Sequence, residues 1–124
     1  MGIAALWVVQ VLVAAAFLVS GATKLSQPKE KLLKKWAWVE DFSHGSVRII
    51  GSLEVLGAIG IVVPALTGIV PSLTPLAALG LVLTMIGAAL THLRRAEYGA
   101  IAVNAVLFIL AALVAYGRFF VLPA

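Results

Sequence analysis

The sequence contains no cysteine among its 124 residues. Disulfides, thiolate metal sites and dithiol relays are therefore excluded, and any thiol chemistry would have to come from a partner protein. Charge is also scarce, because 11% of the residues are charged, against about 25% in soluble domains. The two histidines, His44 and His92, lie far apart with no further ligand at zinc or haem spacing. We therefore expect no bound metal.

Apolar residues dominate instead, at 63% of the chain, and they fall in four long runs. At ~1.5 Å rise per residue, about 20 residues cross a hydrocarbon core of about 30 Å. Short connections between such spans require antiparallel neighbours. The sequence thus predicts an all-α fold, an integral membrane antiparallel four-helix bundle that forms a single transmembrane domain over residues 1–124. The expected spans are about 3–22, 47–66, 73–93 and 98–116.

The longest polar stretch follows the first span and begins with Ser26-Gln27-Pro28, a pattern typical of a helix start. Apolar residues then recur at helical spacing between about residues 28 and 40. This pattern indicates a short amphipathic helix in the membrane interface, with its tryptophans at headgroup level. A solvated linker helix that packs on the end of the bundle is an equally good interpretation. The expected interfacial residues are Lys31, Lys34, Lys35, Trp36 and Trp38.

The net charge of +4 does not indicate nucleic-acid binding. The basic residues flank apolar spans and form no patch on a soluble domain, so anionic lipid headgroups are the expected counter-charge. The positive-inside rule places loops 24–46 and 94–97 in the cytoplasm and both termini outside. The residues on the basic side are Lys24, Lys29, Lys31, Lys34, Lys35, Arg48, Arg94 and Arg95, whereas the other side has only Arg118.

Small residues recur at helical spacing within two spans, where they predict close helix packing. A single amide, Gln10, lies in the first span and is expected to make an interhelical hydrogen bond. Gly117-Arg118 is expected to close the fourth helix. The small-residue stripes are Gly51, Ala58 and Ala65 with Glu54 in the second span, and Gly80, Thr84, Gly87 and Thr91 in the third.

Glu54 is the most informative residue, because it lies about seven residues, or ~10 Å, inside the second span. An ionisable side chain at this depth costs about 2.5–3.5 kcal/mol even on insertion scales, so it should face the bundle interior and have a partner. Asn104 is expected at a similar depth in the fourth span, where it could meet Glu54. Lys24, Arg48 and His92 lie near the same end. We predict that these five residues form a polar constellation at the cytoplasmic mouth of the bundle.

Two interpretations of this constellation remain open. It could bind a polar headgroup, move a proton or hold an anionic or carbonyl ligand, with Glu54 as proton acceptor or hydrogen-bond anchor. It could equally be a structural network in which Glu54 pairs with Lys24 or Arg48 and Asn104 fixes the helix register. For His92, contact with headgroups is favoured over a role as a base.

Gly-Ala-Thr-Lys-Leu at 21–25 and Gly-Ser-Leu-Glu-Val-Leu-Gly at 51–57 resemble the DoxX-like family of small bacterial membrane proteins. Residues 75–80 and 87–92 resemble the third helix of that family. The resemblance implies a four-helix membrane fold and marks Lys24 and Glu54 as the positions that matter. Family members are associated with a thiosulfate:quinone oxidoreductase subunit, with membrane complexes of oxidative or thiol stress, and with receptor-assembly chaperones in animals.

Two functions follow as hypotheses. The sequence favours, by a small margin, a non-catalytic accessory or assembly subunit that docks a membrane or cytoplasmic partner or forms a homo-oligomer. The alternative is a quinone- or lipid-binding subunit of a membrane oxidoreductase, with the polar head at the mouth of the bundle. A proton-coupled transporter is weaker, because no inverted repeat is visible. The sequence shows no catalytic dyad and favours a chain without enzymatic activity. Quinone is the one cofactor that it suggests.

Overall fold

The computed structural model describes residues 2–123, and four helices in this range are long and apolar enough to cross a membrane. The predicted all-α bundle is confirmed, with no strand among the described residues. The spans are α1 (Ile3–Ser26), α3 (His44–Gly60) continued by α4 (Val63–Thr67), α5 (Leu73–Arg94), and α6 (Tyr98–Tyr116) continued by η2 (Gly117–Val121). The short helices α2 (Lys29–Lys35) and η1 (Ala37–Asp41) connect α1 to α3.

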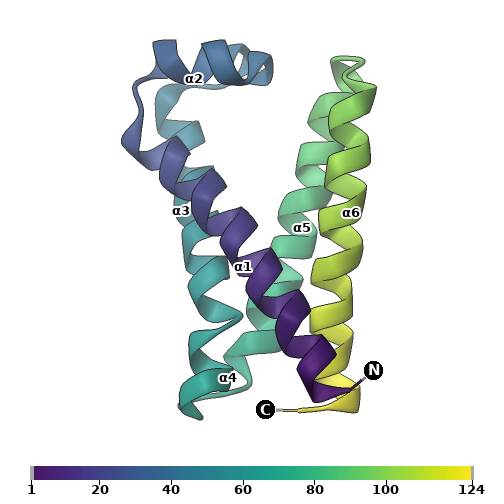
Figure 1. The fold of residues 1–124 in the computed structure, drawn as a ribbon. Helices are drawn as coiled ribbons and strands as arrows, with labels where there is room; N and C mark the ends of the chain where they lie inside the picture. Colours follow the sequence, from purple (N-terminus) through teal and green to yellow (C-terminus); the bar gives the residue numbers. More distant parts are fainter. Residues whose placement is uncertain (1, 124) are drawn as a thin grey trace.

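The four spans form two pairs that diverge toward one end of the bundle (Figure 1). α1 packs along α3, and α5 packs along α6. The pairs come together at the end where both termini lie, which we call the terminal end. The opposite end carries α2, η1 and the α5–α6 connection, and we call it the polar end. This divergence leaves room between the pairs at the polar end.

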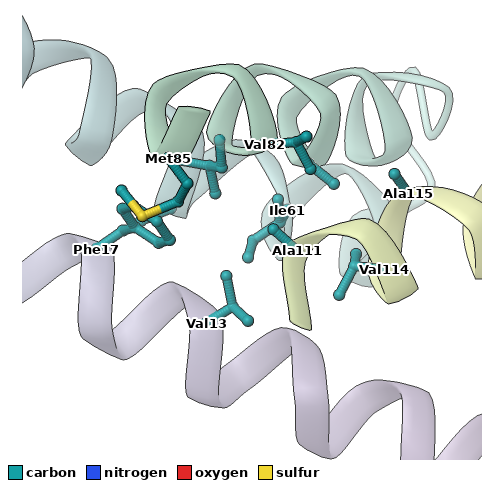
Figure 2. Close-up of a cluster of buried hydrophobic side chains, with 11 residues drawn as sticks. Val13, Phe17, Ile61, Val82, Met85, Ala111, Val114 and Ala115 are labelled. Atoms are coloured by element: carbon teal, nitrogen blue, oxygen red, sulfur yellow. The ribbon is translucent and has the colours of Figure 1, made fainter. Parts of the chain in front are cut away.

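An apolar core joins the two pairs toward the terminal end. Val13 and Phe17 of α1 pack there with Ile61, Val82 and side chains of α6 in one buried cluster (Figure 2). In a bilayer this cluster gains little from hydrophobic expulsion, so its contribution comes from close packing. The core therefore holds the pairs together at one end and leaves them apart at the other.

Two glycines set the close approach of α1 and α3. A Cβ atom added at Gly21 would lie 2.6 Å from the carbonyl oxygen of Gly51, and one added at Gly51 would lie 2.8 Å from the Cβ of Lys24. Both positions therefore exclude a side chain, which confirms the helix contact expected at Gly51. Because the backbones nearly touch here, the polar side chains one turn away on each helix are brought within bonding distance.

The small-residue stripe in the third span does not mark a helix contact, contrary to the prediction. In the described part of the chain, nothing lies within 4 Å of a Cβ added at Gly80 or Gly87. The buried face of α5 instead carries Ala78, Leu81 and Met85, which follow the spacing of a core-facing helix stripe. The larger apolar side chains fill the bundle, and the glycines lie on a neighbouring, unfilled face.

The predicted interfacial helix at 28–40 is divided in two at Trp36. α2 ends at Lys35, Trp36 adopts an extended conformation (φ −135°, ψ 109°), and η1 begins at Ala37. In a continuous helix, side chains two residues apart do not lie on the same face. The extended residue allows Trp36 and Trp38 to stack with ring centroids 6.2 Å apart. The break thus gathers both indoles on the inner side of the segment.

The α-helix of the fourth span ends at Tyr116 with Gly117 as its C-cap, as expected, but the chain continues in a helical path beyond it. Gly117 keeps right-handed helical geometry (φ −61°, ψ −41°), and η2 extends the span as a wider, π-helical turn. Arg118 is consequently buried, and its Nε donates to Gln10 Oε1 at 2.8 Å. Gln10 Nε2 donates in turn to the carbonyl of Ile61 at 2.6 Å. The interhelical hydrogen bond expected of Gln10 is present.

A candidate ligand-binding cavity at the polar end

A cavity of about 720 Å³ lies between the two helix pairs at the polar end. Its volume is within the range of about 300–1,000 Å³ typical of small-molecule sites. Phe17 and Met85, which belong to the core in Figure 2, also line this cavity and separate it from the terminal end. Four of the five residues predicted from the sequence line it as well: Lys24, Glu54, His92 and Asn104.

The strongest interaction in the cavity wall joins α1 to α3. Lys24 Nζ donates to Glu54 Oε1 at 2.6 Å, and both side chains are at least nine-tenths buried. Ser20, one turn before Lys24, accepts a second hydrogen bond from Nζ at 2.6 Å and donates to Glu54 at 3.3 Å. An intramembrane carboxylate requires such a partner. The pairing expected of Glu54 with a cation is therefore present, and the cation is Lys24.

Two tryptophans of the connecting segment cover the ammonium group. Lys24 Nζ lies 4.7 Å from the ring centroid of Trp36 and 5.6 Å from that of Trp38, within the range of cation–π attraction. Phe42 packs edge-on against Trp38 and also lines the cavity. The residues expected in the membrane interface thus contribute two indoles to the wall of the cavity.

Asn104 reaches the cavity from α6 on the opposite side. Its Nδ2 donates to the sulfur of Met85 at 3.4 Å, a weak contact, and its Oδ1 is buried without a hydrogen-bond partner among residues 2–123. The expected contact with Glu54 is therefore replaced by one with Met85, because the helix pairs diverge at this depth. A buried amide oxygen left unpaired costs about 1–3 kcal/mol. A ligand that donates a hydrogen bond would remove this cost.

His92 lies at the rim of the cavity, where a carboxylate orients it. Its Nδ1 is 2.9 Å from Glu97 Oε1 in the α5–α6 connection. Arg95 bonds the other oxygen of Glu97 at 3.2 Å and also bonds Glu40 and Asp41 of η1, each at 2.7 Å. We call Arg95, Glu97, Glu40 and Asp41 the Arg95 clamp. It attaches the aromatic segment, the part of the connection that carries Trp36, Trp38 and Phe42, to the α5–α6 pair.

The charges of the clamp reinforce one another. The hydrogen bond with His92, followed by that with Arg95, lowers the pKa of Glu97 below its ordinary value of about 4.5. Hydrogen bonds with Asp41 and then Glu40 raise the pKa of Arg95 above its usual range. Glu97 and Arg95 therefore both carry their charges at neutral pH, and Arg95 holds the aromatic segment through its bonds to Glu40 and Asp41.

Arg48, the fifth predicted residue, does not join the cavity. It lies in the first turns of α3 with an exposed side chain, and its Nε contacts His44 Nε2 at 3.3 Å. The helix periodicity explains this position, since Arg48 and Glu54 are six residues apart and lie on different faces of α3. The lysines Lys31, Lys34 and Lys35 are also exposed, while Leu32 between them is fully buried.

Sequence reasoning did not single out Ser20 or the Arg95 clamp. Ser20 carried a usable signal, because it precedes Lys24 by four residues and therefore shares its helix face. The clamp joins Arg95 to carboxylates more than fifty residues away, and no spacing rule reaches that far. The inward position of the tryptophans depends on the break at Trp36, for which the sequence gives no sign.

The four apolar spans, the polar pair within them and the cavity between the helix pairs define a multi-pass membrane protein with an intramembrane polar site. The model of the DoxX-like family matches residues 8–114 of the chain. The protein therefore belongs to the DoxX-like family, as its sequence motifs suggested. No curated protein and no solved structure gives a significant match to it.

Proposed function

We propose that this protein binds the polar head of an amphiphile, a quinone or a lipid, in the cavity at its polar end. One observation carries the proposal: the buried Lys24–Glu54 pair and Asn104, whose amide oxygen has no partner among the described residues, line one cavity of about 720 Å³. Apolar pockets with a few convergent polar groups are the usual form of small-molecule sites. A purely structural pair would need no such space beside it.

The polar groups suit a head that both accepts and donates hydrogen bonds. An ammonium group has three N–H donors, and Lys24 directs two of them to Ser20 and Glu54. The third would pass from the indole of Trp36 to a carbonyl or phosphate oxygen of the ligand. On the far wall, Asn104 Oδ1 would accept from a ligand hydroxyl, such as that of a quinol. The indoles of Trp36 and Trp38, beside Lys24, offer flat faces on which a ligand ring, such as that of a quinone, could stack.

The chain is proposed to bind this ligand without transforming it, as a subunit of a larger membrane complex. The sequence favoured docking over ligand binding by a small margin, and the cavity reverses that preference. Docking remains a second function, supported by the exposed lysine face of α2. It predicts that Lys31→Glu/Lys34→Glu/Lys35→Glu releases a co-purifying polypeptide while the small ligand is retained, whereas an unchanged complex after this charge reversal contradicts docking through α2.

The test of ligand binding is native mass spectrometry of the protein released from lipid nanodiscs. We expect the wild type to carry a stoichiometric small molecule that Glu54→Gln loses, because the neutral amide no longer holds the Lys24 ammonium in position. Glu30→Gln is the matched control, since Glu30 is an exposed carboxylate on α2. A wild type without a small molecule, or one whose bound mass is unchanged in Glu54→Gln, contradicts the proposal.

A further inference from the structure

A second hollow opens beside the cavity, in the surface between α3 and α5. It is a groove of about 540 Å³. The residues that matter for its shape are Leu53, Leu56 and Gly57 of α3 with Ala77, Gly80 and Thr84 of α5. Leu53 and Thr84 line both the groove and the cavity. The two hollows are therefore neighbours across a shared wall, and the groove continues the cavity sideways.

The surface of this groove is suited to a hydrocarbon chain. Gly80 leaves it open, because nothing lies within 4 Å of a Cβ at that position. The hydroxyl of Thr84 donates to the carbonyl of Gly80 at 3.0 Å, so its proton is already used within α5. From Thr84 to Ala77 the groove follows seven residues of α5, or ~10 Å. This direction leads from the polar cavity toward the terminal end.

We propose that the groove between α3 and α5 holds the hydrocarbon tail of the ligand whose head lies in the cavity. This inference rests on the proposed function and narrows its ligand class to molecules with an alkyl or isoprenoid chain. The head at Lys24 and Glu54 fixes one end of the ligand, and the wall shared at Leu53 and Thr84 is where the tail leaves. The ligand thereby enters sideways from the bilayer, not from water.

The groove acts by shape and not by hydrophobic affinity. Lipid chains are as apolar as the groove wall, so a tail gains little free energy by moving from the bilayer into the protein. The groove instead decides where a tail can pass while its head is in the cavity. Filling the groove should therefore exclude tailed ligands and leave tail-free heads unaffected.

Gly80→Leu is the variant that fills the groove, because its side chain would project into open space without displacing the core. Leu83→Trp fills it from a second, exposed position on the same wall. Gly99→Leu is the matched control, since a Cβ at Gly99 also has nothing within 4 Å but the residue lines neither hollow.

The probes are a benzoquinone with a diazirine in its decyl chain and a phosphatidylglycerol with a diazirine in one acyl chain. Each is photolysed with the full-length protein in phosphatidylcholine nanodiscs, and the labelled peptides are mapped. We expect one probe, which identifies the ligand source, to label α3 and α5 at the groove saturably, with competition by its unlabelled form. Steric exclusion should lower this labelling by about tenfold in Gly80→Leu and Leu83→Trp, but not in Gly99→Leu. A methyl-benzoquinone, which has no tail, should quench the cavity tryptophans equally in all of these variants.

Other outcomes separate the two proposals. Saturable labelling that requires Glu54 but maps outside the groove contradicts the tail site and leaves the proposed head site in the cavity standing. Labelling that is unchanged in Gly80→Leu has the same meaning. Labelling that no competitor reduces shows bulk lipid in the groove and overturns the tail site as well. Protein–protein crosslinks at Gly80 in place of probe labelling assign the groove to a second copy or another helix. No saturable labelling by either probe, together with no effect of Glu54→Gln, overturns the proposed function itself.

Discussion

At the scale of single residues, the buried Lys24–Glu54 pair accounts for the most unusual feature of the sequence, a carboxylate within a span. Removing one partner of a buried ion pair typically costs about 3–5 kcal/mol, because the other charge is left uncompensated. The two charges are 2.6 Å apart and nearly inaccessible. The pair therefore stabilises the α1–α3 contact only as a unit.

We expect Lys24→Met to destabilise the protein by about 3–5 kcal/mol, and Lys24→Met/Glu54→Leu to be closer to the wild type than the single variant. The reason is that the double variant leaves no isolated charge. Thermal unfolding in nanodiscs measures both, with Lys34→Met as the control for loss of an exposed lysine. Additive effects of the two substitutions would show that the charges do not interact.

At the scale of elements, the contact of α1 with α3 places the pair. Gly21→Ala puts a methyl group 2.6 Å from the Gly51 carbonyl oxygen, so the helices must separate at the level of Lys24. We expect a loss of about 1–3 kcal/mol from overpacking and weaker retention of the cavity ligand. Gly99→Ala, where a methyl group meets nothing, is the control and should be neutral or stabilising. Thermal unfolding and native mass spectrometry measure the two effects, and equal behaviour of both variants contradicts the close approach.

The Arg95 clamp makes the aromatic segment sensitive to acid. The pKa of Glu97 is lower in the folded protein than its ordinary value of about 4.5. The stability that its ionised carboxylate gives to the folded state is therefore complete above about pH 4.5, and it is lost as the pH falls through the lowered pKa. We expect tryptophan emission in a Trp7→Phe background, which reports Trp36 and Trp38, to stay constant from neutral pH down to about 4.5 and to change below it.

Glu40 and Asp41 also bond Arg95. The part of the emission change that is due to Glu97 is therefore the difference between the pH profiles of the wild type and Glu97→Gln. Arg95→Gln removes every bond of the clamp and should show the acid-type emission already at neutral pH. Identical profiles for the wild type, Glu97→Gln and Arg95→Gln would mean that the clamp does not hold the aromatic segment.

At the scale of the whole molecule, nearly all of the basic residues lie at the polar end, and both termini lie at the other (Figure 1). From the positive-inside rule we predict that the polar end faces the cytoplasm. We expect a C-terminal fusion to alkaline phosphatase to be active and one to green fluorescent protein to be dark. The same reporters fused after Ala96, in the α5–α6 connection, should give the reverse pattern. Matching results at both positions would contradict the antiparallel topology, and a full reversal would contradict the orientation.

Much of this architecture could be predicted from the sequence, because a bilayer leaves few choices. A chain in lipid must satisfy its backbone hydrogen bonds within each span, so four apolar runs become four helices. The cost of a buried charge likewise predicted that Glu54 faces inward with a partner. Helix depth then placed Lys24, His92 and Asn104 near it. The exception was Arg48, which lies six residues before Glu54 on a different face of α3 and is therefore exposed.

Only the tertiary structure decided which of these groups meet. The divergence of the two helix pairs keeps Asn104 from Glu54 and creates the cavity between them. The extended Trp36 turns two indoles inward, and Arg95 bonds carboxylates more than fifty residues away. Spacing along one helix determines its buried face, and hydropathy determines its depth. How two helices separate depends on packing between residues distant in sequence, which no local pattern encodes.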